Sequence, residues 1–221
     1  MTAFEVPPER LAAWLGRWAD EHDAIRTETR PGRVTFTGAD GAQVVAEPPF
    51  PPLDPAPTVD AFAPGPLVAH VTRDRIVGVL FVRLGGYAAG VFNGKRLVDS
   101  KVGQRPVHGR SSAGGQSQKR YERRRDGQSR VAHDAAADAG AGVLLHHFDD
   151  LEAVVLGGDR FALAAVLEDP RLRKLARLTS ERVLDVPDPR LAVLRSAPDR
   201  FRATLLRTLD PRPAPKDGAS V

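Results

Sequence analysis

The sequence contains no cysteine in its 221 residues. The chain can therefore form neither disulfides nor thiolate zinc sites, and it cannot use a cysteine nucleophile. No apolar run approaches the roughly 18 residues that span a bilayer. Residues 1–9 lack the basic and apolar regions of a secretory signal. We expect a cytoplasmic protein with no membrane contact.

Positive charge is concentrated in one part of the chain. The net charge is only +4, but residues 95–130 hold eleven Lys and Arg against three acidic residues, a local balance of +8. The rest of the chain then carries a balance of −4. Clustered like charges repel one another in a folded protein. The arrangement favours a polyanionic partner, and nucleic acid is the usual one; a solvated basic face is the alternative.

The first residues predict a small α+β unit over residues 1–47. An amphipathic helix should begin near Pro7–Pro8, because large apolar residues recur there with helical spacing: Leu11, Trp14, Leu15 and Trp18. Residues 33–37 and 42–47 predict a β-hairpin. Eight prolines in residues 48–66 exclude a helix or a central strand there. We interpret this stretch as a linker or an extended wrap.

Residues 67–209 predict a second domain of the α/β class. Three strands joined by short connections should come first, at residues 68–72, 76–84 and 87–92. Later apolar runs at residues 152–156 and 182–186 alternate with helices, one capped by Asp159 and one over residues 189–209. This order indicates a mixed sheet flanked by helices. The tail, residues 210–221, should be disordered.

The most informative stretch is a glycine-rich loop that leads into a basic helix. Residues 103–115 are dense in Gly, Ser and Pro, and adjacent glycines let a substrate approach the main chain closely. The helix after Ser117 has one large apolar residue, Tyr121, before residue 130. Its second half carries a core face of Val131, Ala132, Ala135, Ala136 and Ala139. We expect a helix that is anchored at its C-terminal end, with a basic end that projects outward.

The run from His108-Gly109-Arg110 through Gly114-Gly115-Gln116-Ser117 to the basic helix resembles the catalytic segment of eukaryotic and archaeal peptide release factors. The likeness covers about residues 65–185, the middle domain of those factors, and implies a ribonuclease-H-like fold. The layout is more similar to a bacterial family of stand-alone release-factor-like hydrolases. These are relatives of the eukaryotic enzyme that frees nascent chains from stalled large ribosomal subunits.

The resemblance implies a catalytic glutamine, but two registers compete. The release-factor register makes Gln116 catalytic, beside Gly114 and Gly115. The rescue family carries a Gly-x-x-Gln signature, which residues 115–118 also satisfy, and it favours Gln118. In either register the glutamine would orient water for hydrolysis of the ester between the peptide and the tRNA ribose.

The implied partners are peptidyl-tRNA and the peptidyl-transferase centre of the 50S subunit. Six basic residues would contact RNA phosphates: Arg110, Lys119, Arg120, Arg123, Arg124 and Arg125. We expect a monomer that needs no metal and no cofactor. Two other functions stay open: a ribonuclease that cuts near the tRNA 3′ CCA end, and a non-catalytic factor that binds the ribosome or RNA.

Overall fold

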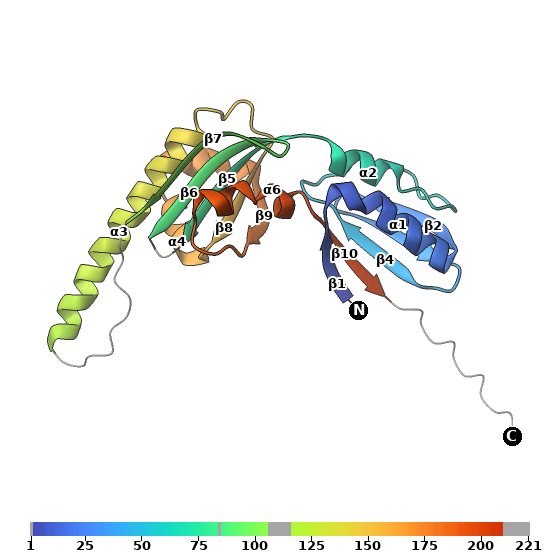
Figure 1. Cartoon of the computed structure of the whole chain (residues 1–221), viewed down its shortest axis with the longest axis horizontal. Helices are drawn as coiled ribbons and strands as arrows, with labels where there is room; N and C mark the ends of the chain where they lie inside the picture. The colour runs from blue at the N-terminus through green and yellow to red at the C-terminus, as the bar shows by residue number, and fades with distance from the viewer. Residues whose placement is uncertain (1, 84, 106–115, 210–221) are drawn as a thin grey trace, which may run out of the picture. The chain divides into compact units, whose positions relative to one another are not determined.

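The computed structural model describes residues 2–83, 85–105 and 116–209, with the side chains of the last range described from Gly127 onward. The chain forms two compact units (Figure 1). The first comprises Met1–Arg73 together with Arg202–Val221, and the second comprises Asp74–Phe201. The second unit is therefore inserted in the sequence of the first.

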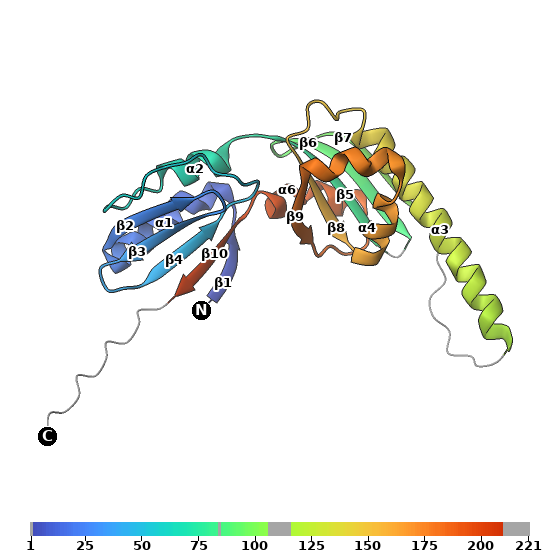
Figure 2. The same ribbon diagram turned by 180° about the vertical axis from the view of Figure 1, so that it is seen from behind.

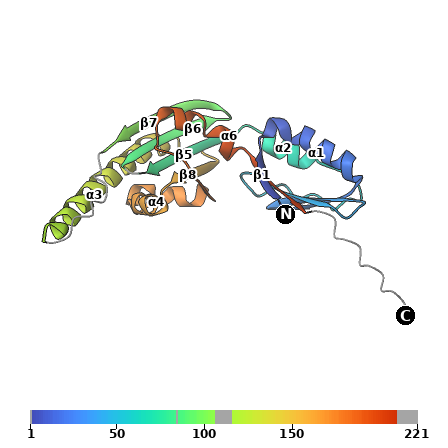
Figure 3. The ribbon, with the colours of Figure 1, turned by 60° about the horizontal axis from the view of Figure 1, so that its bottom comes forward.

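The first unit is an antiparallel five-stranded sheet with two helices on one face (Figure 3). Its strands follow the order β1 (Thr2–Val6), β10 (Thr204–Leu209), β4 (Gln43–Glu47), β3 (Arg33–Gly38) and β2 (Ala24–Arg30). The helices are α1 (Pro8–His22) and α2 (Gly65–Thr72). The predicted N-terminal helix and the hairpin of β3 and β4 are confirmed.

The core of the first unit lies between the sheet and these helices. Leu11, Leu15 and Trp18 are buried on one face of α1, as their spacing predicted. They pack with Val34 and Phe36 of β3 in one apolar cluster. Pro8 in the first turn of α1 suits a position where no backbone N–H bond is required.

The proline-rich stretch, residues 48–66, wraps along the first unit and does not link two domains. Val59 pairs with Thr27 of β2 through two backbone hydrogen bonds, of 2.9 and 3.0 Å. The Thr27 hydroxyl donates to the Ala61 carbonyl at 2.7 Å, and Leu53 is buried. Of the two interpretations, the structure corresponds to the extended wrap.

The prediction of a strand at residues 68–72 was wrong. These residues belong to helix α2 instead. Leu67 and Val71 are buried one helical turn apart in the core of the first unit. The two units divide after Arg73, and not at Leu67 as the sequence suggested. A short apolar run of this length fits a helix as well as a strand.

The second unit is built on a mixed sheet in the order β7 (Arg96–Gln104), β6 (Gly86–Asn93), β5 (Ile76–Arg83), β8 (Ala153–Gly158) and β9 (Thr179–Leu184). The strands β7, β6 and β5 are antiparallel neighbours, whereas β5, β8 and β9 are parallel. The predicted mixed sheet flanked by helices, of the ribonuclease-H-like type, is confirmed.

Helices cover both faces of this sheet (Figures 1 and 3). The helices α3 (Gln116–Leu144) and α4 (Arg160–Leu167) lie on one face with the 3-10 helix η1 (Pro170–Leu178). The short helices α5 (Leu191–Arg195) and α6 (Pro198–Phe201) lie on the other. Asp159 caps α4 as predicted, because its Oδ1 accepts a hydrogen bond from Ala162 N at 2.8 Å.

One prediction for this unit was wrong, and one strand was missed. The single helix expected over residues 189–209 is two short helices, followed by β10, which joins the sheet of the first unit. Strand β7 was not predicted at all, because its exposed and half-buried positions carry charges that the sequence grouped with the basic loop.

Candidate functional site

Helix α3 is held by its C-terminal half. Ala132, Ala136 and Ala139 are buried against the sheet, and Val143 follows one turn later. A Cβ added at Gly140 would lie 3.6 Å from the side chains of Leu80 and Leu172, so the helix backbone lies close to its neighbours. Val131 was predicted in this face, but it is 56% exposed.

The N-terminal half of α3 extends past the sheet (Figures 1 and 2). No residue between Gly127 and Val131 is buried, and burial begins at Ala132. Residues 116–131 correspond to about 24 Å of helix at 1.5 Å per residue. The backbone of α3 therefore has the predicted form: the helix is anchored at its C-terminal end, and the end that carries the basic sequence projects outward.

The structure places part of the predicted site on this projecting half. Gln116 begins α3, and the helix then carries the further predicted residues Gln118, Lys119, Arg120, Arg123, Arg124 and Arg125. The side chains of these seven residues lie outside what the structure describes. Gly114, Gly115 and Arg110 lie outside the described residues altogether.

Two basic residues near the glycine-rich segment were not singled out from the sequence. Lys101 of β7 pairs in register with Ala89, a core residue of the sheet face covered by α3. Arg105 directly follows the end of β7, and its backbone N–H donates to the Gly85 carbonyl at 2.7 Å. Both side chains are exposed. Within the described residues neither Lys101 nor Arg130 of α3 forms an ion pair. A two-residue alternation of charges along β7 was the available signal.

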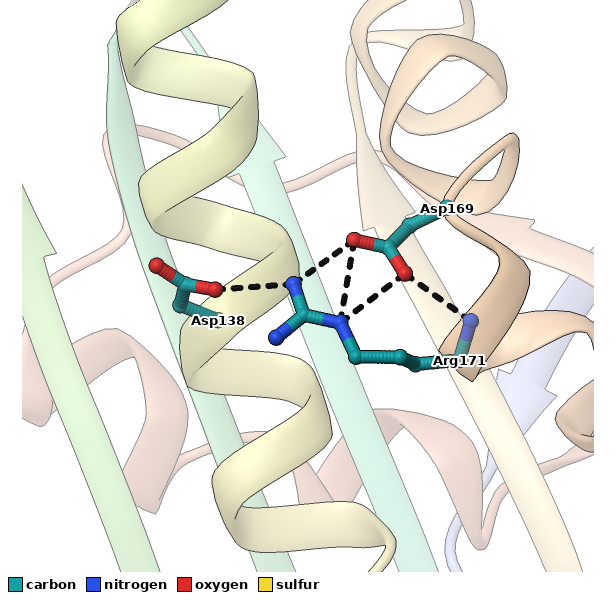
Figure 4. A network of polar contacts seen from close by, with 3 residues as sticks. All are labelled: Asp138, Asp169 and Arg171. Atoms are coloured by element: carbon teal, nitrogen blue, oxygen red, sulfur yellow. Dashed lines mark hydrogen bonds and ion pairs between the residues drawn. The ribbon is translucent and has the colours of Figure 1, made fainter.

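A network of ion pairs connects the anchored half of α3 to η1 (Figure 4). Arg171 Nη2 donates to Asp138 Oδ1 of α3 at 2.8 Å and to Asp169 Oδ2 at 2.7 Å. Arg171 Nε donates to both oxygens of Asp169, and the backbone N–H of Arg171 donates to Asp169 Oδ1 at 2.9 Å.

Hydrogen bonds from Arg171, first from its side chain and then from its backbone, lower the pKa of Asp169 to about 2. The same network raises the pKa of Arg171, with Asp169 as the larger cause and Asp138 as the smaller. Asp169 and Arg171 are therefore both charged at neutral pH.

A second contact lies just after the end of α3. His147 Nε2 is 3.3 Å from Asp99 Oδ2 of β7.

Among the described residues, no three His, Asp or Glu side chains lie close enough together to hold a metal ion. No helix in the same part of the chain is long and apolar enough to cross a membrane.

The sequence model of one protein family, described as "Actinobacteria/chloroflexi VLRF1 release factor" (acVLRF1), matches residues 75–207. This match covers more than half of the chain, including the whole of α3. The chain belongs to this release-factor family. The predicted resemblance to stand-alone release-factor-like proteins is confirmed at the level of the family. No curated protein matches the chain.

Several solved structures are similar to this family member at low sequence identity. An archaeal translation termination factor, aRF1, shows 16% identity and a TM-score of 0.37, over 87% of this chain and 61% of its own. Dom34 of S. cerevisiae, a translation termination-like factor involved in RNA quality control, shows 9% identity and a TM-score of 0.33 (88% and 63%). Pelota of Archaeoglobus fulgidus shows 14% identity and a TM-score of 0.32, over 90% of this chain and 63% of its own. The chain spans about three fifths of the length of these structures.

Proposed function

We propose that the chain is a peptidyl-tRNA hydrolase that releases nascent peptides from stalled large ribosomal subunits. Membership of a release-factor family supports this reaction class. The observation that carries the proposal is the form of α3: its backbone begins at Gln116, and among its residues with described side chains, from Gly127 onward, burial begins at Ala132. A helix held in this way can carry its first turn away from the body of the protein.

The first turn of a helix suits ester hydrolysis. Its first four N–H groups have no partner within the helix, and they carry part of the positive end of the helix dipole. Such groups can stabilise the negative charge that develops on the ester carbonyl oxygen. A neutral glutamine is no strong base, but its amide can hold a water molecule in line with the carbonyl carbon.

Only one of the two glutamines can serve one reaction centre. Successive residues of an α-helix are about 100° apart, so positions 116 and 118 lie about 200° apart around the axis of α3. We assign the water-positioning role to Gln118, with Gln116 as the alternative. Gly114 and Gly115, which precede the helix, would allow the tRNA end to approach the backbone closely.

The basic residues would hold the helix against RNA. Arg110, Lys119 and Arg120 flank the glutamines in the sequence, and Arg123, Arg124 and Arg125 follow one turn later. Phosphate contacts position a protein on nucleic acid without reading its sequence. This would suit a factor that enters the peptidyl-transferase centre of the 50S subunit whatever tRNA is bound there.

The test is single-turnover release from purified 50S–peptidyl-tRNA complexes, with the product identified by mass. We expect free peptide and intact tRNA. Gln118→Ala should lower the release rate by at least about 10²-fold, the usual effect of losing a transition-state donor. Gln116→Ala should have the smaller effect. The control is Gln43→Ala, an exposed glutamine of β4 in the first unit.

The product also distinguishes the other functions. Peptide that is still joined to nucleotides would identify a ribonuclease that cuts near the tRNA 3′ end. Complex formation without cleavage would identify a binding factor. Parental release rates in both single mutants and in the double mutant would refute the hydrolase.

A further inference from the structure

We propose that Arg171 is a positioning residue for the reaction: it fixes the direction of α3, and with it the place of the catalytic glutamine. This inference rests on the proposed function. It comes from a feature outside the basic segment, Arg171 of η1, which contacts Asp138 of the long helix (Figure 4). Arg171 does not touch the substrate and acts only through α3.

Arg171 is itself held in place before it reaches α3. Its guanidinium forms a two-pronged contact with Asp169, through Nε at 3.0 Å and Nη2 at 2.7 Å. Such paired bonds fix the plane of the guanidinium as well as its position. Leu172 and Leu175, on the other side of η1, are 1% exposed in the core. The base of the contact is therefore rigid.

One bond then crosses from this base to α3, from Arg171 Nη2 to Asp138 Oδ1 at 2.8 Å. The side chains of Arg171 and Asp138 are 50% and 62% exposed. Exposed ion pairs contribute little to global stability, because water screens them and their side chains lose freedom. Packing by the apolar side of η1 already holds this segment on the core. The bond from Arg171 to Asp138 therefore restrains the angle of α3 and adds little to the stability of the unit.

Toward the projecting half, the α3 contact resists a change of angle weakly. The buried positions from Ala132 to Gly140 are alanine and glycine, which present low ridges to the sheet, and the larger buried side chains, Val143 and Leu144, lie at the C-terminal end of the helix. Interlocking ridges and grooves are what set the angle between packed elements. With low ridges, a small change of helix angle costs few contacts. A polar link at the edge of the helix can then decide the angle.

The projecting helix amplifies any error at its base. Asp138 lies 22 residues after Gln116, which corresponds to about 33 Å along the axis. A tilt of about 5° at Asp138 would move the first turn by about 3 Å. A misplacement of about 1 Å can lower a reaction rate by about 10²-fold. The crossing bond is thus placed where a small restraint has a large effect.

The experiment uses full-length Asp138→Ala, Arg171→Ala and Arg171→Lys, together with the double mutant of Asp138 and Arg171. Arg171→Lys keeps the charge but loses the planar fork. The control is Arg30→Ala, which removes an exposed arginine paired two residues away with Glu28 in the first unit. Thermal unfolding tests whether each variant folds as the parent does.

Two measurements are made on each variant. The first is the maximal release rate and the half-saturating concentration of 50S–peptidyl-tRNA complex. The second needs no activity: spin labels at Glu122→Cys, 16 residues before Asp138 in α3, and at Phe161→Cys, an exposed residue of α4, report the direction of α3 by their distance distribution. A tilt of about 5° would move the label at position 122 by about 2 Å. The chain has no native cysteine, so these two sites alone are labelled.

We expect Asp138→Ala and Arg171→Ala each to broaden or shift the distance distribution and to lower the maximal rate at least about tenfold, whereas Arg30→Ala should change neither. The half-saturating concentration and the unfolding temperature should stay at parental values, and Arg171→Lys should be intermediate. The double mutant should lower the maximal rate no further than either single alanine mutant does, because the two residues form one contact.

An unchanged distance distribution would overturn the proposal, and so would a broadened one with parental release. If the parental protein releases no peptide, the proposed hydrolase fails and the positioning role fails with it. The label distances would then still show whether Arg171 sets the direction of α3.

Discussion

The ring of Tyr87 on β6 lies against the backbone of Gly103 on the neighbouring strand β7. A Cβ added at Gly103 would lie 2.4 Å from the Tyr87 hydroxyl oxygen and 2.5 Å from Cζ. Tyr87 is only 6% exposed and belongs to the core beneath α3. Gly103 stands near the end of β7, just before the chain continues toward the glycine-rich segment. At this position glycine makes room for a core aromatic ring.

Gly103→Ala should therefore destabilise the second unit. The added methyl group forces a rigid buried ring to move, and overpacking of this kind costs about 1–3 kcal/mol. The measurement is the free energy of unfolding by urea. Gly142→Ala is the matched control, because nothing lies within 4 Å of a Cβ at that exposed helix position. Equal stability of the two variants would contradict the prediction.

Removal of charge from the projecting half of α3 should weaken binding to the large subunit and leave the fold intact. Each lost phosphate contact lowers the salt dependence of log K by roughly 0.7–0.9. Arg123→Ala, Arg124→Ala and Arg125→Ala together should thus flatten the slope by up to about 2–3. A triple change at Arg10, Arg17 and Arg33, which are exposed in the first unit, should leave it unchanged. The comparison requires binding curves at several salt concentrations.

Asp169 should titrate far below an ordinary aspartate. Hydrogen bonds from Arg171 lower its pKa to about 2, so the carboxylate favours the folded state. A group with a lowered folded pKa contributes stability above its unfolded pKa of about 3.9, and that contribution disappears as pH falls toward about 2. NMR titration of the Asp169 carboxyl carbon should show this, and in Arg171→Ala the midpoint should rise toward 3.9. An ordinary midpoint in the parental protein would mean that the contact is absent in solution.

The boundaries of the two units predict which fragments fold. Residues 74–201 contain every strand of the second sheet, so this fragment should keep a cooperative core. A chain cut after Phe201 lacks β10, which pairs with both β1 and β4. Its first unit should lose dispersed amide signals in an NMR spectrum while the second unit keeps them. A folded first unit in the truncated chain would contradict the observed strand order.

Local patterns predicted the elements whose partners lie nearby in the sequence. The hairpin of β3 and β4 and the stripe of Leu11, Leu15 and Trp18 needed only alternation and helical spacing. The anchored half of α3 followed from its alanines, although Val131 proved exposed. The basic projecting half was found because its charges have few acidic neighbours in the sequence.

Two of the features that were missed, strand β10 and the contact of Arg171, depend on distant partners. Thr204, Leu206 and Thr208 alternate as a strand does, but the strands beside them, β1 and β4, lie more than 150 residues earlier. Arg171 looked like one charge among many, because its partner Asp138 is 33 residues away. Spacing along a chain cannot reveal such pairs when each member alone is typical of a solvated surface.

The position of β10 also sets an order for folding during synthesis. The second unit is one continuous stretch, so it can fold once Phe201 has left the ribosome, whereas the first unit must wait for Leu209. Domains commonly fold as units while the chain is still being made, the N-terminal one first. Here that order is reversed: the unit that is begun first is the last to be completed. Until then, β1 and β4 lack the strand that lies between them, and the edges that would pair with β10 stay open on the newly made chain.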